Sequence, residues 1–237
     1  MEYEIKGDSA FPEVEVSLAQ GEQITAEPGA MLSYTPGIEM TTDTGSGGMM
    51  DTAKRAALGG ESVFMNTFTA QSPGIVTLVP PAPGDVSGRF LNQETIYADS
   101  GTFLAAEPNV DISTEFQGAS KFFRSGDAFL LKLSGVGTVF LDSYGAMRKI
   151  ELAQGEQINV DTDHIVAFDS SVQYSTFRAG GLKSQAFGGE GKVAEFTGPG
   201  SVWIQNRDFE SLAEKVFEEE GGGGGGDDDE GGVTDFL

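Results

Sequence analysis

The chain contains the same seven residues twice, because residues 18–24 and residues 152–158 both read LAQGEQI. A chance match of this length in a chain of 237 residues is expected on the order of once in ten thousand sequences, so internal duplication is the simpler explanation. A weaker third copy lies around Ile96, which is 72 residues after Ile24 and 62 residues before Ile158. The sequence therefore predicts one structural unit repeated three times.

Each copy has the pattern of short strands separated by turns. Apolar and polar residues alternate on both sides of Gly21 and Gly155, which is typical of a β-hairpin. A further apolar run follows in each copy, and a glycine-centred turn then predicts a second hairpin. These turns are at residues 72–74, 134–137 and 197–200. We expect an all-β domain over residues 1–206, with units at 1–85, 86–147 and 148–206.

The C-terminal part departs from this pattern. Residues 207–220 place Phe209, Leu212 and Val216 on one face of a predicted amphipathic helix. Six glycines and an acidic stretch follow, and they have too little apolar surface to offset the entropy of ordering. We expect residues 221–237 to be disordered, with the peptide 233–237 as a possible short partner motif.

Residues 45–60 form an insertion in the first copy. Pairs of glycines flank a short segment that combines apolar and basic side chains, namely Met49, Met50, Lys54, Arg55 and Leu58. This composition is typical of a short helix that docks on a membrane surface or a partner protein. The alternative is a plug over the open end of the barrel. A segment of ten residues buries too little apolar surface to anchor a protein to a membrane alone.

The charge balance excludes one class of partner. The chain has 37 acidic and 14 basic residues, giving a net charge of −23. Such a surface repels phosphate backbones, so we expect no nucleic-acid binding. The excess is typical of a halophile that accumulates salt, and an acidic docking surface is the alternative. The start of the chain has no apolar leader segment, which favours a cytoplasmic location, and the prolines within residues 62–84 argue against a membrane span there.

Candidate chemical sites are few. The chain has no cysteine, and His164 is its one histidine, so a multi-histidine metal site cannot form. Asp161 and Asp163 beside His164 allow a carboxylate cation site, although acidic turns are usually solvated. Residues 135–137 match a dinucleotide fingerprint only in letters, since a strand follows them, and Trp203 is expected to pack in the core. We predict a protein that is not an enzyme and that holds no cofactor.

Five ordered segments resemble a known family. They read GGMMDTAKRAALGGESVFMNTFTA, SPGIVTLVPPAPGD, GTFLAA, LSGVGTVFLDSYG and FTGPGSVWIQNR. Over about residues 1–210 the chain resembles the prokaryotic, haloarchaeal-like branch of the mitochondrial biogenesis proteins of the altered-inheritance-of-mitochondria series. The resemblance implies triplicated β-sandwich units of the double-stranded β-helix type, similar to the tryptophan RNA-binding attenuator protein.

Two hypotheses for function follow. The first is a structural or scaffolding protein that acts as a symmetric oligomer at a membrane surface or among partner proteins. Units with open edges need neighbours, and identical chains joined head to tail close into a ring. The resemblance implies a homotrimer whose ring has nine units. The alternative is a small-molecule binding module with ligands in clefts between units.

Deletion of residues 221–237 tests the predicted tail. We expect an unchanged melting temperature, because the segment offers almost no apolar surface to pack on the body. Differential scanning calorimetry of the full and shortened chains measures this. A large loss of stability would show that the tail packs on the folded domain.

Overall fold

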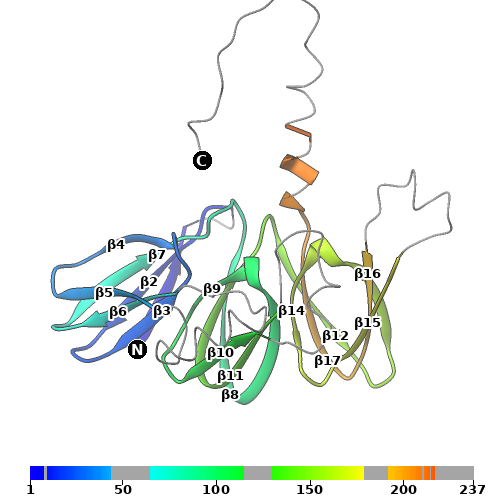
Figure 1. Cartoon of the computed structure of the whole chain (residues 1–237), viewed down its shortest axis with the longest axis horizontal. Coiled ribbons are helices and arrows are strands. Elements are labelled where there is room, and N and C mark those ends of the chain that lie inside the picture. Colours follow the sequence, from blue (N-terminus) through cyan, green and yellow to red (C-terminus); the bar gives the residue numbers. More distant parts are fainter. Residues whose placement is uncertain are drawn as a thin grey trace, which may run out of the picture. The chain divides into compact units, whose positions relative to one another are not determined.

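The computed structural model describes residues 1–7, 10–43, 65–114, 130–178, 192–209, 211–213 and 215–216. The chain divides into two compact units, Met1–Arg207 and Asp208–Leu237. In the first unit almost all regular structure is β-strand, as Figure 1 shows. The predicted all-β class is confirmed.

The strands of Met1–Arg207 form three consecutive groups. The first group has β1 (Glu2–Lys6), β2 (Glu13–Leu18), β3 (Gln23–Ala26), β4 (Met31–Tyr34), β5 (Ile38–Asp43), β6 (Met65–Ala70) and β7 (Gly74–Leu78). The second has β8 (Val86–Asp99), β9 (Phe103–Ala106), β10 (Val110–Thr114) and β11 (Leu130–Asp142). The third has β12 (Met147–Leu152), β13 (Gln157–Asp161), β14 (Ile165–Asp169), β15 (Gln173–Arg178), β16 (Lys192–Thr197) and β17 (Gly200–Gln205). We call residues 1–85, 86–147 and 148–206 modules 1, 2 and 3.

The same antiparallel pairing order occurs in each module. In module 1, β7 lies between β2 and β4, and β6 lies between β3 and β5. In module 3, β17 lies between β12 and β14, and β16 lies between β13 and β15. In module 2 the long strands β8 and β11 pair along their whole lengths, and β9 and β10 pair with the two halves of β11. Strand β1 adds to the edge of β2.

The predicted hairpins are wrong, because the glycine turns are corners between sheets. Strand β2 pairs with β1 and β7, whereas β3 pairs with β6 and β9. The turn at residues 72–74 likewise separates β6 and β7, which belong to different pairings. In module 2 the chain does not turn at residues 134–137 but continues within β11, with a register shift between Gly135 and Val136. Alternation predicts strands, but it does not say which strands pair.

The two LAQGEQI segments form the same turn. Glu22 Oε2 accepts a hydrogen bond from Ala19 N at 2.8 Å, and Glu156 Oε2 accepts one from Ala153 N at 2.8 Å. The glycine that precedes each glutamate has a positive φ, +85° in the first copy and +76° in the second. Glycine adopts this conformation without steric cost, so the repeated letters encode one corner geometry.

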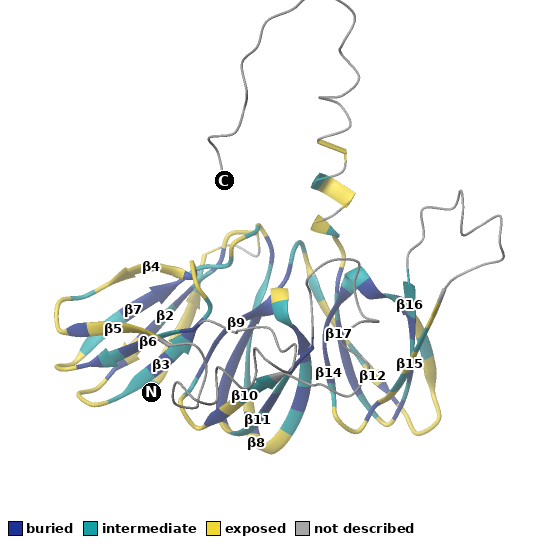
Figure 2. Cartoon of the chain, in the orientation of Figure 1, coloured by how far each residue is buried: buried dark blue, intermediate teal, exposed yellow. Residues whose placement is uncertain are grey.

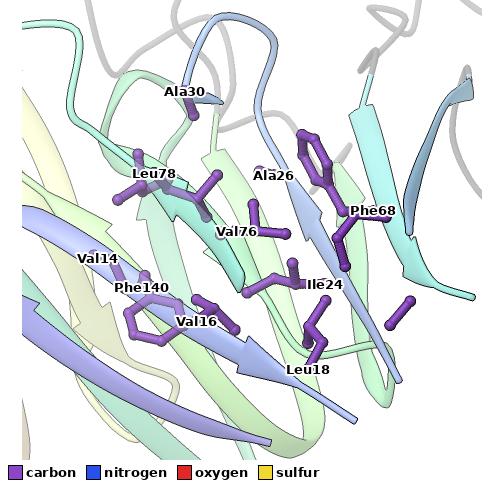
Figure 3. Packing of buried hydrophobic residues seen from close by; sticks show 14 residues of the cluster. Val14, Val16, Leu18, Ile24, Ala26, Ala30, Phe68, Val76, Leu78 and Phe140 are labelled. Carbon is purple, nitrogen blue, oxygen red and sulfur yellow. The ribbon is translucent and has the colours of Figure 1, made fainter. Parts of the chain in front are cut away.

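Three hydrophobic core clusters fill the domain, and the first two include residues of the following module. The first cluster, drawn in Figure 3, combines module 1 with Leu104, Ala105 and Phe140 of module 2. The second combines modules 1 and 2 with Val166, Ala167 and Trp203 of module 3. Among the described residues, the third cluster contains no residue of module 1. The first two cores are therefore completed by the module that follows each of them in sequence.

The unit Asp208–Leu237 is described at only a few residues. Residues 209, 211–213 and 215–216 have helical backbone, and Ser211 N donates a hydrogen bond of 2.9 Å to Asp208 Oδ2. The other residues of the expected helix, and the tail 221–237, lie outside the described residues. The helix over 207–220 stays a prediction. In the described part of the chain, no helix is long and apolar enough to cross a membrane.

Replacing Phe140 tests whether module 2 supplies part of the first core. Phe140 is fully buried and makes an edge contact with Tyr3 at 4.7 Å between ring centroids. We expect Phe140→Ala to lower the free energy of unfolding by about 3–5 kcal/mol, as for other buried phenylalanines. Phe90→Ala is the matched control, because Phe90 is 60% exposed, and should change it by at most about 0.5 kcal/mol. Similar small losses from both variants in urea denaturation would contradict the shared core.

Candidate functional site

Neighbouring modules are joined by short antiparallel strand pairs. At the first junction β3 pairs with β9, and Ala26 lies opposite Ala105. At the second junction β8 pairs with β14, and Ala98 lies opposite Ala167. Both Ala105 and Ala167 are the third residue of their strand. The two junctions therefore use one register.

A backbone carbonyl at the same position of the strand accepts a hydrogen bond in both junctions. Leu104 O accepts from Glu27 N at 3.0 Å in the first, and Val166 O accepts from Thr102 Oγ1 at 2.9 Å in the second. Leu104 and Val166 are each the second residue of their strand and are completely buried. An edge strand of one module is thus fixed against the preceding module by hydrogen bonds to its backbone carbonyls and by burial.

The second junction adds an ionic contact between modules 2 and 3. Arg89 binds Asp169 at 2.7 Å, and its guanidinium lies 4.5 Å from the centroid of a Trp203 ring. The Lys149 ammonium lies 5.6 Å from the centroid of a Trp203 ring. Trp203 is only 9% exposed and belongs to the second core cluster, so the predicted packing role is confirmed. This tryptophan holds two modules together by packing and by cation–π contact.

Strand β4 occupies in module 1 the place that β9 and β14 occupy in modules 2 and 3. Among the described residues it pairs only with β7, so its other edge has no neighbouring strand. All four of its residues are exposed, as Figure 2 shows, whereas all four residues of β9 are buried. Leu32 is 54% exposed, and its counterparts Leu104 and Val166 are completely buried. We call this uncovered strand the β4 edge.

Strand β13 of module 3 is the counterpart of β3 and of the second half of β8. In the part of the chain that the structure describes, it pairs only with β16. Ile158 is half-buried there, although its counterparts Ile24 and Ile96 are completely buried. We call this strand the β13 edge. The β4 and β13 edges together are the candidate functional site, since strand edges without a neighbouring strand are templates for strand pairing.

A cleft of about 710 Å³ lies on module 1. Its lining includes Leu18, Glu22, Thr35, Pro36 and the turn at residues 73–75. Glu22 binds the Met1 ammonium at 2.9 Å in this cleft. Hydrogen bonds from Ala19 N and from the Met1 ammonium lower the pKa of the Glu22 carboxyl. The cleft has the size of a small-molecule site, but its principal charge is already paired.

Two acidic side chains lie close together at the first junction, the buried Asp142 and the half-buried Glu27. Asp142 is 3% exposed, and its Oδ1 atom has no hydrogen-bond partner. Burial raises the pKa of Asp142 from 3.8 to about 7, and burial together with the Asp142 charge raises the pKa of Glu27 from 4.5 to about 8. The module 3 counterpart of Asp142 is Gln205, a neutral side chain whose Nε2 donates to Asp163 O at 3.0 Å. Because burial disfavours charged carboxylates, ionisation of Asp142 and Glu27 is expected to destabilise the junction.

The residues around His164 form a capped turn. Asp161 Oδ1 accepts a hydrogen bond from Asp163 N at 3.2 Å, at the start of the short 3-10 turn η2 (Thr162–His164). His164 Nδ1 lies 2.9 Å from Gln205 O. Within the described ranges, no three histidine or acidic side chains are placed to hold a metal ion. These contacts account for the turn through backbone capping.

The predicted docking segment cannot be placed. Its residues Met49, Met50, Lys54, Arg55 and Leu58 lie outside the described residues. The closing peptide 233–237 lies outside them as well. Both remain expectations from the sequence.

Comparison with known proteins gives a consistent result. A family model described as "Mitochondrial biogenesis AIM24" matches residues 3–207. An uncharacterized protein of Streptococcus pyogenes serotype M6 is 27% identical over 220 residues, which are 90% of this chain and 88% of that protein. A crystal structure of a Streptococcus pyogenes protein from a structural genomics consortium has a TM-score of 0.78 and 26% identity, and the match covers 92% of this chain and 99% of the other.

The buried acids predict a pH dependence of stability. Because the pKa values of Asp142 and Glu27 are raised in the folded state, the unfolded chain releases protons that the folded chain keeps. Stability should therefore fall as the pH rises from about 4 to about 8. We expect Asp142→Asn to be more stable than the parent chain at pH 8 by roughly 2–4 kcal/mol, with little difference near pH 4.

Urea denaturation across this pH range measures the effect. Asp111→Asn is the matched control, because Asp111 is an exposed acid on β10 of the same module. Its stability relative to the parent chain should not vary with pH. An Asp142→Asn variant whose stability relative to the parent chain is the same at every pH would show that folding does not raise the pKa of Asp142.

Proposed function

The chain belongs to the Mitochondrial biogenesis AIM24 family, and we propose that it is a non-enzymatic scaffold that acts as a symmetric assembly of its own copies. One observation carries this proposal. All four residues of the β4 edge are exposed, although the equivalent strands of modules 2 and 3 are covered by a preceding module. A surface of this kind is expected to be covered by a partner in the working protein.

The repeated pairing order supports assembly from identical units. We infer that modules 1, 2 and 3 are copies of one duplicated unit, each of which covers an edge strand of the next. Such head-to-tail contacts either continue without limit or close into a ring. We propose closure by three chains, a nine-unit ring similar to that of the tryptophan RNA-binding attenuator protein.

The charge and the insertion suggest the setting of this scaffold. We propose a salt-adapted prokaryotic protein of the cytoplasm whose net charge of −23 keeps it away from nucleic acids. The insertion that carries Lys54 and Arg55 is the proposed contact with a membrane surface or a membrane-associated partner. The acidic surface and the basic insertion would give the assembly two chemically different faces.

A small-molecule binding module is the second candidate, and the cleft beside Glu22 is the observation that favours it. A thermal-shift screen with metabolites and metal ions separates the two functions. A ligand that raises the melting temperature in proportion to the logarithm of its concentration would support the binding module. The scaffold proposal predicts that no such ligand is needed for assembly.

Light scattering in molar salt tests the assembly directly. We expect a particle of three times the chain mass of 24.9 kDa. Three chains carry three times −23, or −69, so we expect the particle to dissociate at low salt, where the Debye length reaches about 30 Å at 0.01 M. A monomer in molar salt would refute the assembly, whereas a trimer at every salt concentration would refute only the electrostatic expectation.

A charged residue on the β4 edge should abolish assembly. We expect Leu32→Lys to be a folded monomer, because Leu32 is 54% exposed in the single chain but its charge would be buried in the assembly. Met40→Lys is the matched control on β5, where Met40 is 42% exposed and the counterpart strands have no partner module. It should assemble as the parent chain does. A trimeric Leu32→Lys variant would show that the β4 edge is not part of the interface between chains.

A further inference from the structure

The β13 edge has the same position in module 3 that the paired strands have in modules 1 and 2. Ala26 and Ala98, which make the two internal junctions, each follow an isoleucine of the repeat by two residues. The residue at this place in module 3 is Val160, which lies opposite Ala194 on β16 and is 7% exposed. Val160 is therefore the residue that a following module would meet.

Strand β4 has the same pairing within its module as β9 and β14, the strands that face the preceding module at the two junctions. Ala105 lies opposite Phe140, Ala167 lies opposite Trp203, and Ser33 lies opposite Thr77. In all three strand pairs, β9–β11, β14–β17 and β4–β7, the register shifts next to this residue pair. Because the register shift occurs at the same position in each pair, it defines which residues of β4, β9 and β14 correspond. Ser33 is therefore the counterpart of Ala105 and Ala167.

The core clusters show what such a contact would supply. In the first two cores the following module contributes two residues from its edge strand and one aromatic residue, and the third core has no such contribution from module 1. The corresponding residues of module 1 are Leu32, Ser33 and Thr77, and Leu32 is 54% exposed. The third core and the residues that would complete it thus lie at opposite ends of one chain.

Hydrogen bonds fix the expected geometry of the pair. Glu27 N donates to Leu104 O at 3.0 Å in the first junction, and Ser170 N donates to Thr95 O at 3.1 Å in the second. In the first junction the bonded residue Glu27 is one residue from Ala26, and in the second the bonded residue Ser170 is three residues from Ala167. Both separations are odd numbers of residues. Because bonded and non-bonded pairs alternate between antiparallel strands, the alanine pairs are non-hydrogen-bonded pairs, with Cα atoms about 4.5 Å apart.

We infer that the β4 edge of one copy pairs with the β13 edge of a second copy, antiparallel, with Ser33 opposite Val160 and Tyr34 opposite Asn159. This inference rests on the proposed self-assembly and names the partner strand and the register. The partner is a second copy because one chain has both strands needed for the junction, and among the described residues each of them has an edge without a neighbouring strand. The strands β5, β10 and β15 are not expected to pair with a second copy, since none of them pairs with another module in the described residues.

Cysteine cross-linking tests the register in a chain that has no cysteine of its own. A mixture of Ser33→Cys and Val160→Cys chains, oxidised mildly in molar salt, should give a covalent dimer of twice 24.9 kDa. The expected Cα separation of about 4.5 Å lies within the range that disulfides span. The double variant should give covalent trimers. Tyr34→Cys with Asn159→Cys is a second pair in the same register, for use where Val160→Cys lowers stability.

The control mixture pairs Ser33→Cys with Asp161→Cys, one residue out of register. A shift by one residue turns the side chain to the opposite face, so we expect about ten-fold less dimer. Efficient cross-linking of Ser33→Cys alone would overturn the inference and indicate a symmetric β4–β4 contact. A trimer in which neither pair cross-links would overturn the register and leave the scaffold standing, whereas a monomeric parent chain would overturn both.

Discussion

Modules 2 and 3 of this protein each complete the core of the module before them, and the other features of the structure depend on that constraint. Leu104 and Phe140 lie in the first core, and Val166 and Trp203 lie in the second, although all four come from the next module in sequence. A core that needs a neighbour cannot be closed at the end of a chain of such modules. The exposed β4 and the uncovered β13 are the consequence of this arrangement.

The same constraint explains the local features of the sequence. The LAQGEQI corner carries the chain from one sheet to the other, so the strand after it can pair with the neighbouring module instead of with its predecessor. Glu22 and Glu156 close that corner by accepting the backbone N–H of Ala19 and Ala153. The junctions differ in chemistry, because the first holds the buried Asp142 and the half-buried Glu27, whereas the second has the pair of Arg89 and Asp169. We therefore expect pH to act mainly on the first junction.

The sequence predicted part of this structure, for identifiable reasons. The repeated heptapeptide and the alternation of apolar residues predicted strands and a recurrent turn, because both are local properties. The predicted hairpins failed because alternation looks the same whichever strand is the partner. The candidate site had no local signal, since Met31 and Leu32 are as apolar as Phe103 and Leu104, and only the presence of a neighbouring module distinguishes them. The buried Asp142 was missed because an acid at a strand end is usually solvated.

Hydrogen–deuterium exchange as a function of protein concentration tests the central claim most directly, because it observes both edges in the unmodified chain. We expect peptides covering β4 and β13 to gain protection together, at the concentration where the particle forms in molar salt. The peptide covering β5, an edge of the same module without an expected partner, should exchange equally in monomer and assembly. Protection of β4 without protection of β13, or assembly with neither protected, would contradict the proposal that one copy completes the core of the next.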